Sequence, residues 1–332
     1  MKENPPDTKD VELVHKLSEK IKKVKREISK VIVGQEDIID QLLISLFSRG
    51  HCLLVGVPGL AKTLLIKTVA EVMDLKFSRI QFTPDLMPSD ITGTEIIEED
   101  TLTKKRDFKF ISGPIFANIV LADEINRTPP KTQAALLEAM QEYKVTAAGV
   151  TYQLPQPFFV LATQNPIEQE GTYPLPEAQL DRFMFNLWLE YPSYKEEIKI
   201  VETTTSEYKA KLDKVLSANE IMEFQDLVRK VPVAENVIEF AVKVSNMTRP
   251  TNGNSPQFIK DWITWGAGPR ASQYMILSAK TRAIINGRYT PNIEDVKLAM
   301  LPVLRHRIIT NFSAEAEGIK SVDVIERLSR EI

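Results

Sequence analysis

Hydrophobic positions follow two periods in the first part of the chain. Short apolar runs typical of buried strands alternate with stretches in which apolar residues recur every three or four positions, as in helices. The predicted strands cover 51–55, 77–82, 117–122 and 157–163, and the predicted helices cover 35–49, 61–73 and 130–142. Strands that alternate with helices indicate an α/β fold, a parallel sheet with helices on both faces.

The pattern changes after residue 193, where apolar residues recur only at helical spacing. The predicted helices of this part cover 195–212, 217–230, 234–247, 270–286 and 292–304. At the other end, a helical pattern over 11–32 follows polar, proline-containing residues. We therefore expect a disordered tail over 1–10, a core domain over 11–193, a linker helix region over 194–215 and a smaller all-helical domain over 216–332.

Two stretches interrupt the alternation of the core domain. Residues 84–113 should form a helix by position, yet their glycines and alternating apolar residues predict a short helix bearing a β-hairpin. A second hairpin is predicted at about 145–156, next to the last predicted strand of the core. We expect both hairpins to face a client or a pore.

Composition limits the class of protein. The 332 residues have a net charge of −3, which argues against a protein that mainly coats nucleic acid. One cysteine and three histidines give no zinc-ligand spacing, and Cys52 is expected to be a buried small hydrophobe. The N-terminus lacks the apolar segment of a signal peptide, and no run of about 18 apolar residues is present, so we expect a soluble, cytoplasmic protein.

Residues 56–63 read Gly-Val-Pro-Gly-Leu-Ala-Lys-Thr and are close to a phosphate-binding loop between a strand and a helix. The glycines allow backbone N–H groups to turn toward phosphate oxygens, and the helix N-terminus adds partial positive charge. Lys62 is expected to reach the β- and γ-phosphates of ATP, and the Thr63 hydroxyl is expected to bind Mg²⁺. The predicted ATP-binding residues of this segment are Gly56, Pro58, Gly59, Leu60, Ala61, Lys62, Thr63 and Leu64.

Ala61 departs from this motif, which has glycine before the lysine. A methyl group is tolerated there if the residue already has helical φ and ψ angles, so we expect a variant loop that still binds phosphate. The alternative for the octapeptide as a whole is a Gly/Pro turn that only happens to carry similar residues.

Two carboxylates, Asp123 and Glu124, follow the apolar run at 119–122. The ends of parallel strands meet at one edge of a sheet, so both are expected near the phosphate loop. Asp123 would hold Mg²⁺, directly or through water, and Glu124 would polarise the attacking water. The alternative is a strand that ends in a solvated acidic turn.

Asn165 follows the next strand and precedes Pro166. Its amide could form hydrogen bonds with both the γ-phosphate and the attacking water. The alternative is a turn-forming asparagine before proline.

Two arginines are candidates for contact with a γ-phosphate. Arg182 is expected to be an arginine finger, acting on a neighbouring subunit if it cannot reach its own loop; the alternative is an ion pair with Asp181 or Glu177. Arg270 follows Pro269 at the start of a predicted helix, an unfavourable place for a cation. We expect a nucleotide phosphate to bind there, with an idle surface arginine as the alternative.

Together these residues resemble the AAA+ ATPases, and within them the MoxR type. The resemblance extends from Val31 to about Arg307. It rests on the phosphate loop with its alanine and on three long blocks, at 113–141, 162–166 and 175–183. It implies a P-loop NTPase αβα sandwich followed by a helical lid domain. The stretch at 84–113 would be the helix-2 insert, and the second hairpin the pre-sensor-1 hairpin.

The resemblance also implies roles for single residues. Lys62 and Thr63 would be the Walker A residues, Asp123 and Glu124 the Walker B pair, Asn165 sensor 1, Arg182 the arginine finger and Arg270 the sensor 2 arginine. Val33, Gly34 and Gln35 would lie where such proteins hold the adenine. The family implies hexameric rings and chaperone-like activity, often beside partners with von Willebrand factor A domains.

We therefore expect Mg²⁺-dependent ATP hydrolysis coupled to the remodelling, maturation or metal loading of a protein client. A switch that binds ATP without hydrolysis is the first alternative. A P-loop kinase would leave the helical domain and Arg182 unexplained.

A DNA-remodelling motor is a more distant alternative, and it depends on basic residues in the 84–113 stretch. These are Lys104, Lys105, Arg106 and Lys109. Acidic neighbours largely cancel their field: Glu95, Glu98, Glu99, Asp100 and Asp107.

Overall fold

The computed structural model describes residues 8–99, 106–147, 149–167, 171–207 and 210–332. A parallel five-stranded sheet forms the centre, with the strand order β2-β5-β8-β1-β9. Its strands are β1 (Cys52–Val55), β2 (Phe77–Gln81), β5 (Ile119–Asp123), β8 (Phe159–Gln164) and β9 (Phe185–Trp188). The predicted α/β class is confirmed, although the sequence pattern did not predict β9.

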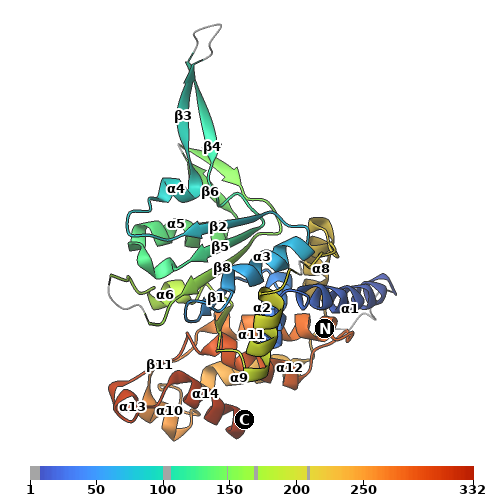
Figure 1. Cartoon of the computed structure of the whole chain (residues 1–332). Coiled ribbons are helices and arrows are strands. Elements are labelled where there is room, and N and C mark those ends of the chain that lie inside the picture. The colour runs from blue at the N-terminus through green and yellow to red at the C-terminus, as the bar shows by residue number, and fades with distance from the viewer. Residues whose placement is uncertain (1–7, 100–105, 148, 168–170, 208–209) are drawn as a thin grey trace.

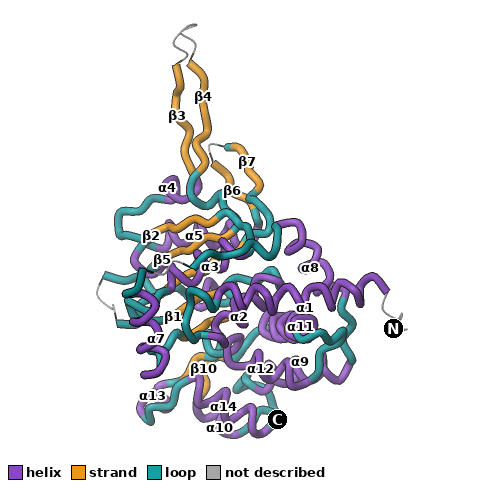
Figure 2. Tube along the Cα trace, turned by 45° about the vertical axis from the view of Figure 1, so that its right-hand side comes forward, coloured by secondary structure: helices purple, strands orange, loops and turns teal. Residues whose placement is uncertain are grey.

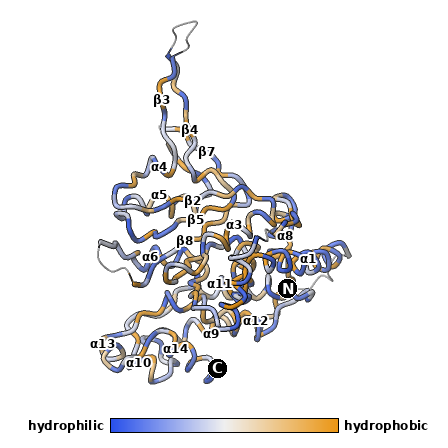
Figure 3. The backbone as a smooth tube through the Cα atoms, viewed as in Figure 1, coloured by the Kyte–Doolittle hydropathy of each residue, from blue (hydrophilic) through white to orange (hydrophobic). Residues whose placement is uncertain are grey.

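The period of two in the strands divides the interior into two hydrophobic layers. Figure 3, which colours the backbone by hydropathy, shows apolar stretches along the central strands. Cys52 and Leu54 of β1 face one layer, and Leu53 and Val55 face the other. Helices α2 (Glu36–Phe47) and α3 (Lys62–Val72) pack in the first layer, and α5 (Pro130–Glu142) packs in the second. Cys52 is buried, as predicted, and burial raises the pKa of its thiol to about 12.

The first layer continues without a break into the helical part of the chain. Helix α1 (Thr8–Ile28) packs against α3 of the core and against helices of this part (Figure 2), and it buries Leu17, Ile21 and Val24. It includes residues 8–10, which the sequence placed in a tail; residues 1–7 lie outside the described residues. The two predicted domains thus share one hydrophobic core.

Most of the helical part lies below the sheet in Figure 1. Its helices are α7 (Tyr194–Thr204), α8 (Ala218–Lys230), α9 (Glu235–Met247), α10 (Gln257–Trp262), α11 (Pro269–Ile285), α12 (Ile293–Leu304), α13 (Phe312–Ala316) and α14 (Ser321–Glu331). The expectation of an all-helical domain needs one correction, because two short antiparallel strands, β10 (Ile263–Trp265) and β11 (Ile309–Thr310), pair there. Each has at most three residues, too few for a visible period of two.

Both predicted hairpins are present. Helix α4 (Pro88–Thr92) leads into β3 (Gly93–Glu99) and β4 (Arg106–Ser112), which project from the body (Figure 1). The smaller hairpin consists of β6 (Lys144–Ala147) and β7 (Val150–Gln153). Phe110 of the first stacks on Tyr152 of the second, with ring centroids 4.1 Å apart. Two further short elements are η1 (Ile125–Arg127) and α6 (Glu177–Leu180).

Candidate active site

The carboxyl ends of three neighbouring strands, β1, β5 and β8, lie together. We call this side of the sheet, where the strands end, the loop edge. The N–H of Gly56, the residue after β1, donates to the carbonyl of Gln164 at the end of β8, at 3.2 Å. The N–H of Glu124, the residue after β5, donates to the Thr163 hydroxyl at 2.9 Å. The loop edge thus brings together the predicted phosphate loop, the two predicted carboxylates and Asn165.

The geometry of the loop explains its glycines. A side chain on Gly56 would collide with Leu189, and Gly59 has a φ of +90°, which side chains disfavour. Helix α3 begins at Lys62, so the first N–H groups of the helix have no acceptor within the helix and can bind an anion. The Lys62 ammonium donates to the Gly56 carbonyl at 2.6 Å, which folds the lysine back over the loop.

Ala61 differs from the expectation. Its φ of 54° and ψ of 26° lie in the left-handed region, not in the right-handed conformation of the following helix. Alanine in this region costs about 1 kcal/mol more than glycine because its Cβ crowds the following carbonyl oxygen. The methyl group is therefore accommodated with strain, which explains why glycine is the usual residue there.

Asp123 is buried, and both of its carboxylate oxygens have partners. Arg79 on β2 donates to Oδ2 at 2.7 Å and 3.1 Å, and the Thr163 hydroxyl donates to Oδ1 at 2.6 Å. The predicted alternative, a solvated acidic turn, does not describe this buried carboxylate.

Glu124 has a left-handed backbone, with φ 57° and ψ 49°. Its Oε2 accepts from the Gln81 amide at 2.8 Å and pairs with Arg127 at 3.1 Å. Unusual backbone angles in residues other than glycine concentrate at functional sites, where the surrounding structure stabilises them. The carboxylate is therefore held at the loop edge by side chains from two elements.

Sequence reasoning missed Arg79 and Gln81. Both lie on β2, whose residues pair with β5 so that Gln81 is opposite Asp123. Their signal was present as polar residues at alternate positions of the strand, on either side of Ile80, but strand neighbours are not visible in the sequence.

Asn165 is buried, and its side-chain oxygen accepts from the N–H of Ile167 at 3.2 Å. This is the turn that the alternative interpretation predicted before Pro166. The same geometry fixes the amide, and among the described residues no group accepts a hydrogen bond from its nitrogen. The turn and a ligand contact are therefore compatible.

Val33, Gly34 and Gln35 line a cavity of about 580 Å³ between the start of α2 and the ends of β9 and α12. Leu189, which also lines it, contacts the phosphate loop at Gly56, so the two adjoin. Three buried polar atoms around this cavity lack a partner among the described residues: Oε1 of Gln35, Oδ1 of Asn186 and Nε of Arg305. Such atoms favour a polar ligand.

Arg182 and Arg270 lie on the opposite side of the sheet, where the strands begin. We call this side the arginine edge. The N–H of Met184 donates to the carbonyl of His51, which precedes β1, whereas the phosphate loop follows β1. The four residues of β1 span about 13 Å, at about 3.3 Å per residue. The two predicted arginines are thus brought together, but away from the loop of their own chain.

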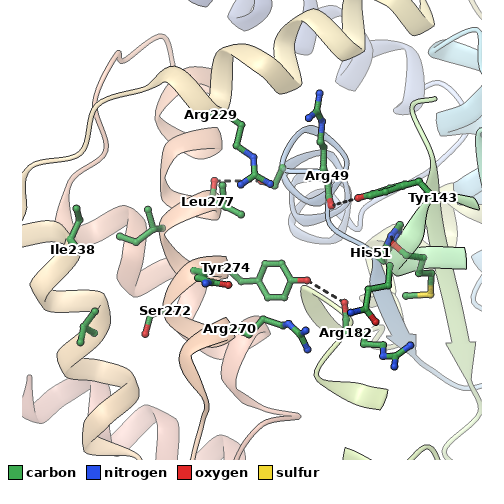
Figure 4. A pocket seen from close by; sticks show the side chains of 16 residues that line it. Arg49, His51, Tyr143, Arg182, Arg229, Ile238, Arg270, Ser272, Tyr274 and Leu277 are labelled. Atoms are coloured by element: carbon green, nitrogen blue, oxygen red, sulfur yellow. Dashed lines mark hydrogen bonds between the residues drawn. The ribbon is translucent and has the colours of Figure 1, made fainter. Parts of the chain in front are cut away.

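The two arginine side chains line one cavity of about 650 Å³ between the sheet and the helical part (Figure 4). Arg49 and Arg229 line it as well. Within the described part of the chain, Arg182 forms no ion pair, so the predicted alternative of a pair with Asp181 or Glu177 is wrong for these residues.

Asp181, which the alternative paired with Arg182, instead forms an ion pair with Arg270. The Arg270 guanidinium lies 2.6 Å from the Asp181 carboxylate. The helix dipole favours an anion at the start of α11, and in the free chain this anion is the Asp181 carboxylate and not a nucleotide phosphate.

The buried histidines are structural. His51 accepts from the N–H of Val160 at 3.1 Å and bonds the carbonyl of Met140 at 3.0 Å, and burial lowers its pKa to about 4. Burial, together with Arg307, lowers the pKa of His306. Neither ring can serve as a base that titrates near neutral pH.

The charged residues of the large hairpin pair with each other. Arg106 lies 3.0 Å from Glu99, and Lys109 lies 2.9 Å from Glu98. The side chain of Asp107 and the residues Asp100, Lys104 and Lys105 lie outside the described residues. The described cations of this hairpin are therefore neutralised.

Comparisons with known proteins agree with the fold. Residues 51–185 match the ATPase family associated with various cellular activities (AAA), and residues 258–328 match an AAA lid domain. Chaperone MoxR1 of Mycobacterium tuberculosis is 43% identical over 91% of this chain and 79% of its own length. The protein MoxR of Methylorubrum extorquens is 29% identical over 85% of each chain. The crystal structure of a presumed ATPase from Cytophaga hutchinsonii superposes with a TM-score of 0.90 at 43% identity, over 97% of this chain and 96% of that one.

The parallel sheet with a phosphate-loop motif at its edge defines the class of P-loop nucleotide-binding proteins. Within that class, the chain belongs to the MoxR-type AAA+ ATPases. Among the described residues, no helix is long and apolar enough to span a lipid bilayer.

Proposed function

We propose that this chain hydrolyses ATP with Mg²⁺ at the junction between neighbouring subunits of a hexameric ring, and that the cycle remodels a protein client. The observation that carries the proposal is the separation of the two edges. The phosphate loop lies at one edge, and Arg182 and Arg270 lie at the other. A head-to-tail ring would bring the loop edge of one subunit against the arginine edge of the next.

The loop edge supplies the binding half of this site. Lys62 would leave the Gly56 carbonyl for the β- and γ-phosphates, and the cavity beside Val33, Gly34 and Gln35 would hold the adenine. Thr63 and Asp123 offer the oxygen ligands that Mg²⁺ prefers. Among the described residues, no group of three acidic, histidine or cysteine side chains that could hold a metal ion is present. Bound Mg²⁺ would neutralise charge on the phosphates.

Glu124 and Asn165 would act on the attacking water. The carboxylate of Glu124 would polarise it, and the amide nitrogen of Asn165 would donate to the γ-phosphate. Gln81 and Arg127 hold the Glu124 carboxylate in the free chain, so productive geometry requires at least one of these contacts to change.

The arginine edge supplies the charge that hydrolysis needs. Arg182, and Arg270 through the guanidinium N–H groups that do not bond Asp181, would contact the γ-phosphate of the neighbouring subunit. This arrangement favours action in trans for both residues.

A protein client fits the projecting hairpin better than a nucleic acid does. Ile97 and Phe108 are 61% and 74% exposed on it, and its described cations are paired with carboxylates. The relative from Mycobacterium tuberculosis is named a chaperone. The client would be a protein that undergoes maturation or metal loading. Proteins with von Willebrand factor A domains are further candidate partners.

The experiment is ATP turnover per subunit over a wide range of protein concentration with Mg²⁺. Turnover that rises with concentration and then saturates supports a site completed between subunits. Turnover that is independent of concentration in a chain shown to be monomeric contradicts the shared site.

A switch that binds ATP without hydrolysis is the second candidate. The contacts of Glu124 with Gln81 and Arg127 favour it, because they occupy the carboxylate that hydrolysis needs. Tight ATP binding with no turnover at any concentration, with or without a client, is the result that would select it.

A further inference from the structure

The segment that carries Arg182 is anchored by Arg307, a residue outside every predicted motif. The Arg307 side chain is 2% exposed and lies just after α12. Its guanidinium donates to the main-chain carbonyls of Asp181 at 2.8 Å, Phe183 at 2.7 Å and Met184 at 3.3 Å. Because these carbonyls flank Arg182 on both sides, Arg307 fixes the backbone from which the Arg182 side chain extends.

The Asp181 carboxylate connects this anchor to Arg270. One oxygen accepts from Nε of Arg307 at 2.7 Å, and the other accepts from Nη1 of Arg270 at 2.6 Å. Two guanidinium groups so close would repel, and the carboxylate between them offsets that repulsion.

Tyr274 adds a third connection. It lies one helical turn after Arg270 on α11, and its hydroxyl donates to the main-chain carbonyl of Arg182 at 3.3 Å (Figure 4). The Arg307 guanidinium packs over its ring, 5.2 Å from the centroid. The segments that carry Arg182 and Arg270 are therefore joined through one set of side chains.

We propose that Asp181 and Arg307 are positioning residues that hold Arg182 and Arg270 as one rigid unit for the γ-phosphate of a neighbouring subunit. The inference rests on the proposed function. Arginine side chains are flexible, and a displacement of about 1 Å at a catalytic group can cost about 100-fold in rate. A buried anchor in the helical part reduces that freedom for both arginines.

The test uses the full chain with Asp181→Asn, which keeps the size of the side chain and removes the charge. We expect turnover to fall by about 10- to 100-fold while ATP affinity at the variant's own phosphate loop stays unchanged. The variant is then mixed with Glu124→Gln subunits, which have an inactive site of their own and intact arginines.

Recovery in the mixture is the distinguishing result. In a ring assembled from equal amounts, about one quarter of the junctions combine an intact site with intact arginines, so turnover should return to about that fraction. A residue that merely stabilises its own subunit would not be rescued by a neighbour. The matched control is Asp226→Asn, because Asp226 also pairs with an arginine of the same cavity, Arg49, at 2.6 Å. We expect the control to keep its turnover.

Tyr274→Phe provides a second test that removes only a hydroxyl group. We expect a smaller loss of turnover, again recovered in the mixture. The inference is overturned if Asp181→Asn has wild-type turnover, or if it stays inactive in mixtures in which Arg182→Ala recovers. A wild-type chain that never hydrolyses ATP contradicts the proposed function instead, and the two failures are therefore distinct.

Discussion

The two edges of the sheet differ in how their residues are brought together. At the loop edge, the phosphate loop and Glu124 each follow directly from the end of a strand, so short sequence motifs define them. At the arginine edge, Arg182 and Arg270 are 88 positions apart, and Arg307 is more distant still. A local motif can identify a binding loop, but a site assembled from distant segments depends on how the helical part packs.

Arg182→Ala should give the largest effect at the arginine edge. We expect turnover to fall by about 1,000-fold or more, because the residue would stabilise charge in the transition state. ATP binding should stay unchanged, since the loop of the same chain is intact. Turnover and binding assays on one preparation check this, and a parallel loss of ATP affinity would place Arg182 at its own loop.

Acid should destabilise the arginine edge through its buried histidines. The pKa of His51 falls from 6.5 to about 4 on folding, because burial disfavours the charged ring. Between pH 6.5 and about 4 the unfolded chain binds a proton at His51 and the folded chain does not. The free energy of unfolding is therefore highest above pH 6.5 and falls by about 3 kcal/mol in total as the pH drops to about 4. Denaturant unfolding at pH 7, 5 and 4 measures it. A His51→Gln variant should lose part of the pH dependence, and an unchanged slope would contradict the assignment.

Glu124→Gln should lower turnover by about 100-fold, because a group that polarises the attacking water is lost. Mixing it with Lys62→Ala sharpens the comparison, since both changes lie at the loop edge. No junction then has an intact loop edge, so we expect no recovery, in contrast to mixtures with Arg182→Ala. Recovery with Lys62→Ala would show that the two residues do not belong to the same half-site.

Ala61→Gly should give the smallest effect. Glycine relieves the left-handed strain, worth about 1 kcal/mol, but loses part of that gain to the greater freedom of the unfolded chain. We expect a slightly higher melting temperature and turnover within about twofold of the original. A clear loss of stability would indicate that the methyl group makes contacts that offset its strain.

Much of the fold was predictable because it rests on local patterns. Four of the five parallel strands, both hairpins and five helices of the second part, α7, α8, α9, α11 and α12, follow from hydrophobic periodicity. Helices α10, α13 and α14 were not predicted. Strand β9 was missed although it lies in a mostly apolar run over 183–189 and is as long as β1, which was predicted. Strands β10 and β11 are shorter still, and their pairing depends on segments about 45 residues apart.

The candidate site was predictable to a similar degree. The sequence pointed to the loop residues, Asp123 and Asn165, which lie together in the fold. It did not point to Arg79 and Gln81, since only strand order places β2 beside β5. The partner of Arg270 was also beyond prediction, because Asp181 reaches it only when the helical part packs against the start of β9.

The sequence by itself determined the phosphate loop, the carboxylates at the end of β5, the α/β pattern and the family resemblance, because each depends on neighbouring residues and their spacing. Only the tertiary structure decided that the arginines lie at the far edge of the sheet, that Asp181 joins Arg270 to Arg307, and that Ala61 is left-handed. The physical reason is that strand order and helix docking follow from burying one hydrophobic core shared by the whole chain, which no short segment specifies.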